Sequence, residues 1–342
     1  MAHGDKAALR LTIGLGLAVF VAYGFALQSP FVVCVMAVLI LCKPGPPMRL
    51  AKGLVVAVAF AALVSAWVLM VPLLEHYAGA AVLLTALMLY LLLYAGRIGG
   101  NPLTTILVLS FTLIPVVGVA DQALVGALAV TLAIGVGVGT VVSAASNAFF
   151  PDNAARSAAA AGRLPPDRGA AAWIALRGML IVMPVFVLAL TDPSFYLAAI
   201  MKTVALGQQA EEADARTAGR ELVGSTLMGA LMGAAVWMGL SLWPSLWMLM
   251  LWLMAAALWS GSSLFGARRS RFPPSFWSNA LITALILLGP AIEDSASDKS
   301  VLEGSVMRTC LFLGVAFYAW GTIWALERWR ARRLGPTPTA TG

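Results

Sequence analysis

The chain has 342 residues, of which 61% are hydrophobic and only 11% are charged, and its formal net charge is +7. A soluble domain carries roughly 25% charged residues, so this composition excludes an ordinary soluble protein and indicates helices that are surrounded by lipid. The positive charge does not indicate nucleic-acid binding, because the basic residues gather in loops on one side of the predicted membrane spans.

About twelve apolar stretches are predicted to be membrane helices, which need about 17–25 residues, or fewer where a helix is buried among others. Lys6 and Arg10 before the first stretch also fit a signal peptide, but a second apolar run starts at Phe31, which favours a retained helical hairpin. The predicted spans are 9–27, 30–42, 51–72, 79–96, 102–119, 122–146, 172–190, 193–207, 219–240, 243–265, 275–291 and 305–326.

The charged residues alternate between the loops of this arrangement. If the N-terminus is cytoplasmic, the inside loops contain nearly all Lys and Arg residues, and Lys299 is the clear basic exception outside. Such a one-sided distribution predicts that both termini are cytoplasmic. A single missed span would invert every later loop and remove the pattern. The other charged residues and the histidine of the outside loops are Glu75, His76, Asp121, Asp192, Glu293, Asp294, Asp298 and Glu303.

The second half of the chain repeats the plan of the first. Each half begins with Ala-Leu-Arg (ending at Arg10 and Arg177), and each continues through an apolar stretch to a turn before a proline, Pro30 or Pro193. An even number of spans per half makes the repeats parallel. We therefore expect an all-α integral membrane protein with two parallel six-helix repeats. Its expected parts are the first repeat (1–150), a short cytoplasmic linker (151–171), the second repeat (172–327), and a tail that is basic and then disordered (328–342).

The short segments 30–42 and 193–206 occupy matching places in the two halves. Short or interrupted segments at matched positions point to the binding site of a secondary transporter, which lies between its repeats. Pro30 and Pro193 are tolerated in a first helical turn, and the helix N-terminus favours an anionic group. The alternative is that both are simply short helices after tight turns.

Three basic residues are candidates for contact with an anionic substrate. Lys202 interrupts the second short segment, and a charge within a membrane helix is costly and commonly functional. Arg177 and Arg10 lie at matching positions near the start of the two halves. The alternatives are that Lys202 extends to the headgroups along its own side chain and that both arginines anchor helix ends at the cytoplasmic edge. Arg308, near the outer surface, is expected to anchor its helix or to pair with Glu303.

Few acidic groups are available to carry a proton. Asp121 and Asp192 sit at the outer edge, each near the start of a helix, and Asp is a good N-cap residue, so a structural role competes with proton coupling. Glu75 and His76 are further candidates in the outside loops.

Ser225, Gly229 and Gly233 are spaced four residues apart and form one small-residue stripe on a helix. Such a stripe permits close helix packing, which we take as its role. The neighbouring Gly219-x4-Gly224-Ser225-Thr226 lacks the lysine of a phosphate-binding loop, so nucleotide binding is excluded. We expect no cofactor and no metal.

The Q-S-P-F turn that contains Pro30, the Lys43-Pro44 pair, and the R-x-x-x-R-x-x-x-G-S-T-x-x-G run from Arg216 resemble the fusaric-acid-resistance and aromatic-acid-exporter superfamily. The resemblance covers most of both halves. It implies an inner-membrane efflux permease for aromatic carboxylic acids or related drugs, driven by proton-motive force and often assisted by a periplasmic membrane-fusion adaptor. The larger exporters have a sizeable cytoplasmic domain after each half, whereas this chain is similar to the compact, membrane-only subfamily.

The leading hypothesis is therefore a multi-pass efflux permease for organic anions in the bacterial inner membrane. A passive anion channel and a membrane subunit that transports only with an adaptor are the alternatives, and a homo-oligomer is also considered. A membrane-embedded enzyme is not expected, because Gly261-Ser262-Ser263 has no histidine in the later spans to activate it.

Overall fold

Helices joined by short turns make up nearly all of the computed structural model, which describes residues 3–42, 50–100, 103–151, 168–212, 217–296 and 301–334. Nine helical segments of these residues are long and apolar enough to cross a membrane, and the shorter apolar helices are Pro30–Leu41, Thr104–Ala120 and Phe195–Gly207. The chain is thus an all-helical, multi-pass membrane protein. In order, the helices are α1 (His3–Gly24), α2 (Pro30–Leu41), α3 (Leu50–Trp67), α4 (Met70–His76), α5 (Ala78–Gly99), α6 (Thr104–Ala120), α7 (Gln122–Phe149), α9 (Arg168–Thr191), α10 (Pro193–Glu212), α11 (Ala218–Leu242), α12 (Leu246–Leu264), α13 (Pro274–Ala296) and α14 (Val301–Leu334).

The described helices follow the predicted spans closely, with differences at their ends. The predicted span 51–72 is divided into α3 and α4. Helix α9 begins at Arg168, inside the expected linker, and α14 continues through the basic segment to Leu334. The rest of the linker, at 152–167, and the tail from 335, for which disorder is expected, lie outside the described residues.

Local chemistry explains where several helices begin and end. The Asp121 carboxylate accepts a hydrogen bond from the backbone N–H of Ala123 (2.8 Å) at the start of α7, and the Ser245 hydroxyl accepts one from Met248 (3.2 Å) at the start of α12. These bonds satisfy N–H groups that have no partner within the helix. Gly100 ends α5 with φ of +58°, a left-handed conformation that glycine adopts without steric cost.

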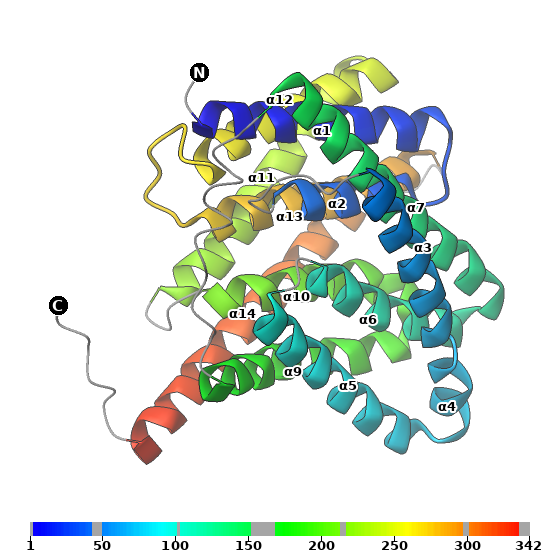
Figure 1. Cartoon of the computed structure of the whole chain (residues 1–342), viewed down its shortest axis with the longest axis vertical. Coiled ribbons are helices and arrows are strands. Elements are labelled where there is room, and N and C mark those ends of the chain that lie inside the picture. Colours follow the sequence, from blue (N-terminus) through cyan, green and yellow to red (C-terminus); the bar gives the residue numbers. More distant parts are fainter. Residues whose placement is uncertain are drawn as a thin grey trace.

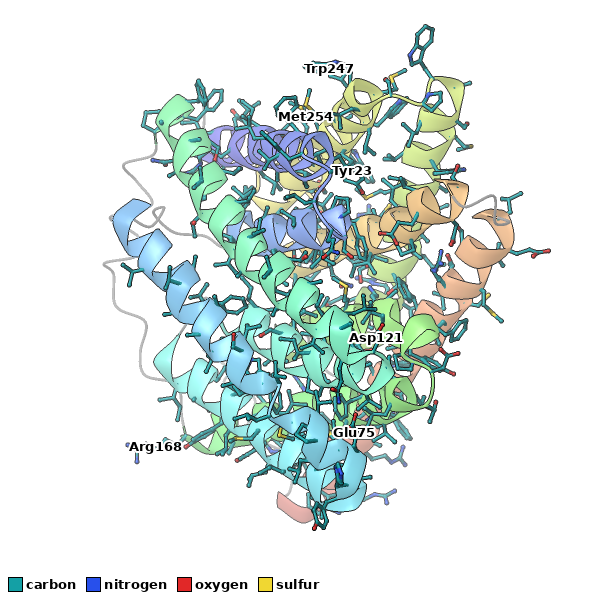
Figure 2. The ribbon with its side chains drawn as sticks, turned by 90° about the vertical axis from the view of Figure 1, so that its right-hand side faces the viewer. Tyr23, Glu75, Asp121, Arg168, Trp247 and Met254 are labelled. Atoms are coloured by element: carbon teal, nitrogen blue, oxygen red, sulfur yellow. The ribbon has the colours of Figure 1, made fainter. Side chains whose placement is uncertain are left out.

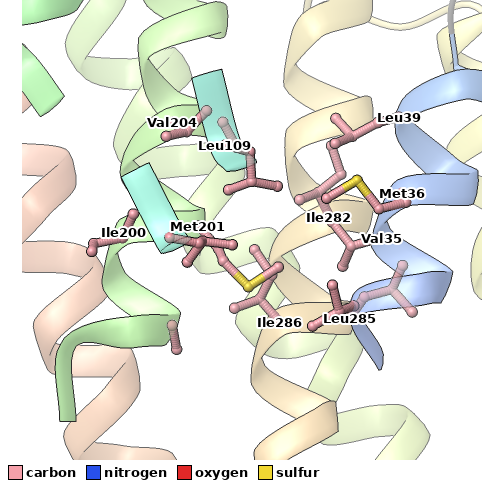
Figure 3. Close-up of a cluster of buried hydrophobic side chains, with 14 of the residues drawn as sticks. Val35, Met36, Leu39, Leu109, Ile200, Met201, Val204, Ile282, Leu285 and Ile286 are labelled. Carbon is pink, nitrogen blue, oxygen red and sulfur yellow. The ribbon is translucent and has the colours of Figure 1, made fainter. Parts of the chain in front are cut away.

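The helices form an inner group and an outer group. In α2, every residue from Phe31 to Leu39 is buried, and most of α6 is buried as well. In α13, 83% of the most apolar window is buried, against 22% in α5. Figure 3 shows side chains of α2, α6, α10 and α13 packed together at the centre. Helix α5, in contrast, exposes leucines to the surroundings, as expected for a lipid-facing helix.

Contacts between the two halves of the chain occur in matching pairs. Helix α1 packs on α12 and α9 packs on α5, while α2 packs on α13 and α10 packs on α6. Figure 1 shows the α1–α12 pair at the top of the molecule and the α9–α5 pair at the bottom. In the upper pair, the side chain of Met254 on α12 lies directly against Gly16 of α1 (Figure 2). The first turn of α1 and the last turn of α14 lie on the same side of the molecule (Figure 1).

Candidate functional site

Lys202 lies within α10 and is completely buried, with 0% of its surface exposed. Its Nζ donates hydrogen bonds to Oγ1 of Thr283 (2.6 Å) and to Oδ1 of Asn279 (3.2 Å). Both acceptors belong to α13 and are four residues apart, so they project from the same face of that helix. The ammonium group is therefore held by two neutral side chains of a neighbouring helix, and it does not extend to the membrane surface.

The hydrogen bonds continue from α13 to α11. Nδ2 of Asn279 donates to Oγ of Ser225 (2.7 Å), and this hydroxyl donates in turn to the backbone carbonyl of Leu222 (3.0 Å). The Thr283 hydroxyl donates to the carbonyl of Asn279 (2.6 Å), which leaves its oxygen free to accept from Lys202. The network of Lys202, Asn279, Thr283 and Ser225 connects three helices with consistent donor and acceptor roles.

Within the described part of the chain, no carboxylate forms an ion pair with Lys202. An ammonium group has three N–H donors, and two of them have acceptors here. Hydrogen bonds to neutral groups supply no compensating negative charge to a protonated lysine side chain. A protonated Lys202 therefore lacks a third acceptor and a compensating negative charge among the described residues.

The small-residue stripe of α11 brings this helix close to α13. A Cβ atom added to Gly229 would lie 2.5 Å from Cβ of Thr283 and 2.6 Å from the Ala280 carbonyl oxygen. Gly233 also faces α13, where Ala284 is its nearest neighbour. Only a residue without a side chain permits this approach at Gly229, and the same approach lets Asn279 reach Ser225. The packing role predicted for Ser225, Gly229 and Gly233 agrees with this geometry, and Ser225 also contributes a hydrogen bond.

The Lys202 network does not lie on the seam between the two halves, where the sequence led us to expect the site. All of its members belong to helices of the second half, α10, α11 and α13. The seam is filled by apolar side chains, among them Met36 of α2 and Met201 of α10 (Figure 3). Successive residues of a helix differ in direction by about 100°, so Lys202 and Met201 face different neighbours.

Arg177 and Arg10 have partners of their own on other helices. Arg177 is 5% exposed and forms an ion pair with Glu327 of α14 (3.4 Å), whose Oε1 also accepts from the Trp173 indole (3.0 Å). Arg10 donates to Oδ1 of Asn147 in α7 (3.1 Å). The three cations predicted to act together are thus distributed over three separate groups of partners.

Each proline begins its helix as predicted, but only α2 is short, since α10 continues to Glu212. Pro30 is the first residue of α2, and Pro193 is the first residue of α10. The N-terminus of α10 is capped by a carboxylate, since the N–H of Phe195 donates to Oδ1 of Asp192 (3.2 Å). Lys202 lies nine residues after Pro193, about 13 Å further along the helix. A small anion bound at Lys202 therefore does not also contact the helix N-terminus.

The carboxylates predicted for proton coupling are helix caps. Asp121 caps α7 and Asp192 caps α10, which agrees with the structural alternative of the sequence. Next to Asp121, Nε2 of Gln122 donates to Oε1 of Glu75 (3.1 Å), and Figure 2 shows Glu75 and Asp121 on the side that faces the viewer. Near the start of α14, Arg308 forms its ion pair with Asp294 (2.8 Å) and not with the expected Glu303.

The sequence did not reveal Asn279, Thr283 or Glu327 as partners of the buried cations. One available signal was the Asn-x-x-x-Thr spacing within an apolar helix, which places two hydrogen-bonding groups on one face. Lys43, Pro44 and Arg216, which carry part of the family resemblance, lie outside the described residues.

Residues 7–146 match the model of a membrane-protein family that is described as a protein of unknown function (DUF2955). The match covers the region from α1 to the end of α7. No curated protein and no solved structure matches the chain. The comparisons therefore agree with a membrane protein, and the function has to be argued from the site.

Proposed function

We propose that this protein is a secondary transporter of organic anions, with aromatic carboxylates as the expected substrates, and that Lys202 binds the substrate carboxylate. The observation that carries the proposal is the burial of Lys202 among apolar helices with only neutral hydrogen-bond partners among the described residues. The resemblance to the aromatic-acid exporters supports the same substrate class independently.

The charge of a protonated Lys202 is costly at its position within the membrane. A lysine at the centre of a membrane helix costs about 2.5–3.5 kcal/mol on insertion scales. Asn279 and Thr283 reduce this cost by hydrogen bonding but provide no negative charge. A carboxylate beside the ammonium group offsets the charge and forms a charge-assisted hydrogen bond. Such an uncompensated cation is useful to a protein that must bind an anion and then release it.

Lys202 is enclosed in this conformation, so transport requires a second arrangement of the helices. In many secondary transporters one bundle of helices moves against another around a fixed site. The side chains that Figure 3 shows between α2, α6, α10 and α13, among them Met36 and Met201, are apolar and cannot form hydrogen bonds to one another. We therefore infer that the two halves separate along this seam to open a path to α10.

The proposal includes two parallel six-helix repeats with both termini cytoplasmic. The paired contacts support the repeats, because the first helix of each half packs on the fourth span of the other half (α1 on α12, α9 on α5). Contacts at the helix ends support the topology. Lys6 contacts Pro151 and Arg220 lies over Phe272, and these basic residues belong to the side proposed to be cytoplasmic. At the other end of α7, Gln122 contacts the acidic Glu75, on the side proposed to be outside.

Efflux across a bacterial inner membrane, driven by proton-motive force, completes the proposal and follows from the family resemblance. Asp121 and Asp192 are the proposed proton carriers, and each would have to leave its capping position during the cycle. A membrane-fusion adaptor is proposed as the partner on the outer side. Asp121→Asn and Asp192→Asn variants test the coupling, since asparagine retains an acceptor for the cap but does not carry a proton.

The test uses proteoliposomes that contain the full chain and a labelled hydroxybenzoate. We expect accumulation when a proton gradient is imposed, and a loss of at least tenfold in the initial rate for Lys202→Met. The matched control is Lys6→Met, which removes the same charge at the start of α1, where Lys6 only contacts the Pro151 carbonyl. Equilibration without accumulation would favour the passive channel.

Transport that is unchanged in Lys202→Met would refute the role of this residue. Absence of transport by the wild-type protein, restored by a co-reconstituted adaptor, would favour the adaptor-dependent subunit. Absence of transport in both conditions for a series of aromatic and aliphatic carboxylates would refute the substrate class.

A further inference from the structure

A groove of about 340 Å³ lies between α11 and α14, and none of its lining residues belongs to the Lys202 network. One face of α11 and two aromatic residues of α14 form its walls. The lining residues are Gly219, Arg220, Val223, Gly224, Phe317 and Trp320.

One wall of the groove depends on a glycine of α11. The Trp320 indole packs directly against Gly219, where an added Cβ atom would lie 2.6 Å from its Cε2 atom. Gly224, five residues further along α11, also lines the groove, although a Cβ atom added there would lie 3.2 Å from the Phe276 ring of α13. Phe317 and Trp320 are three residues apart, so they project from the same face of α14 toward this space. These residues line one mostly apolar space between α11 and α14, called the slot below.

A single positive charge stands at one end of the slot. Arg220 is exposed, and its guanidinium lies 5.5 Å from the centre of the Phe272 ring. Among the described residues it forms no ion pair with a carboxylate. The Phe272 ring holds the guanidinium from one side by a cation–π contact, and its hydrogen-bond donors stay available to an oxyanion.

The position of the groove in the membrane indicates its occupant. Arg220 is the third residue of the span Ala218–Leu242, so it lies at the membrane surface, whereas Gly224 and Phe317 lie deeper. Phe317 is 52% exposed and Trp320 is 40% exposed, on helices that face lipid. A charge at the surface with an apolar slot beneath it is complementary to an amphiphile that has an anionic head and a hydrocarbon chain.

We propose that the α11–α14 groove binds one anionic phospholipid. Arg220 binds the phosphate, and one acyl chain follows the slot past Val223, Phe317 and Trp320. Because a guanidinium presents paired N–H donors, it matches phosphate oxygens better than an ammonium group does. The proposal requires only that the helices cross a membrane, and it is independent of the transport function proposed for Lys202.

The test measures lipids that remain bound to the purified full-length protein by native mass spectrometry. Phosphatidylglycerol and phosphatidylcholine with identical acyl chains are added at equal concentrations. We expect one tightly retained phosphatidylglycerol per chain, and about fivefold weaker retention for Arg220→Gln, as typical for one basic residue at an anionic surface. Val223→Trp fills the slot without changing any charge and should also abolish the retained lipid.

The matched control is Arg97→Gln, which removes the same charge from the end of α5 in the first half. It should retain the lipid as the wild-type protein does. Arg220→Lys keeps the charge, so its intermediate retention separates charge from folding, and thermal unfolding of each variant checks that it is folded. Equal retention of both lipids, unchanged retention in Arg220→Gln or in Val223→Trp, or a second protein chain in place of the lipid would overturn the proposal.

Discussion

The Nζ atom of Lys202 lies 2.6 Å from the Oγ1 atom of Thr283, although the two residues are 81 positions apart in the chain. This bond joins α10 to α13, the most completely buried of the candidate spans. By contrast, the hydroxyl of the adjacent Thr203 bonds only to the carbonyl of Ala199 in its own helix. The hydrogen bond between Lys202 and Thr283 therefore connects the basic side chain of α10 to the buried helix α13.

Replacing Thr283 by valine should weaken this connection. Valine has a similar shape but no hydroxyl, so the buried ammonium loses its closest acceptor, which we expect to cost about 1–3 kcal/mol of stability. The loss should be smaller in a Lys202→Met background, and a double-mutant cycle of thermal unfolding measures the difference. Thr226→Val is the control, because the Thr226 hydroxyl bonds only to the Leu222 carbonyl of its own helix. Equal effects of Thr283→Val in both backgrounds would contradict the coupling.

A methyl group at Gly229 should push α11 away from α13. The added carbon would overlap Thr283 and the Ala280 carbonyl, and overpacking of this kind costs about 1–3 kcal/mol. Gly137→Ala makes the same substitution within α7, where nothing lies within 4 Å of the new carbon. That control should be neutral or slightly stabilising, since alanine favours helix more than glycine does. The measurement is the unfolding temperature of each variant in the same detergent, and we expect a lower value for Gly229→Ala than for Gly137→Ala. Similar values would be inconsistent with close packing at Gly229.

The Glu327 carboxylate should hold the last turns of α14 against α9. It accepts from Arg177 and from Trp173, and Trp173 also stacks on Trp329 (ring centres 6.1 Å apart). Because Glu327 is 30% exposed, we expect a modest loss of about 1 kcal/mol for Glu327→Gln. Hydrogen exchange should rise at 327–334.

The control for Glu327→Gln is Asp294→Asn, which removes the ion pair with Arg308 near the opposite end of α14. This change should leave exchange at 327–334 as it is in the wild-type protein. If both substitutions increased exchange there equally, the effect would come from general loosening of α14 and not from the contact with α9.

The proposed topology predicts different accessibility for the two ends of α5. His76 lies just before α5 and Arg97 lies in its last turn; the helix has 22 residues and is about 33 Å long, which is sufficient to cross a bilayer. In a cysteine-free background, His76→Cys should react with a membrane-impermeant maleimide in intact cells. Arg97→Cys should react only after permeabilisation. The reverse pattern would invert the topology, and reaction of both sites in intact cells would mean that α5 does not cross the membrane.

The spans could be predicted from sequence because lipid-facing helices need long apolar runs, and α5, α11 and α12 have them. The break between α3 and α4 was not predicted. Pro72 explains it, because proline has no N–H to donate to the carbonyl of Val68 and its ring clashes with that carbonyl. This signal was available, but the apolar run continues across the break and conceals it.

The candidate site was predicted only in part. Lys202 stands out because a charge is rare in an apolar segment. Asn279 and Glu327 do not stand out, because their importance depends on which helices pack together. Which neighbouring helix Lys202 faces also depends on the rotation of α10 about its axis. The residues on both sides of Lys202 are uniformly apolar, so the sequence does not determine this rotation.

The order of synthesis gives the hydrogen bond between Lys202 and Asn279 a consequence for membrane insertion. Asn279 follows Lys202 by 77 residues, which corresponds to about 4–15 s at usual elongation rates of roughly 5–20 residues per second. During that interval α10 has emerged from the ribosome while α13 does not yet exist. Lys202 is therefore synthesised before its acceptors, and the hydrogen bonds that connect α10 to α13 can form only after α13 has been made.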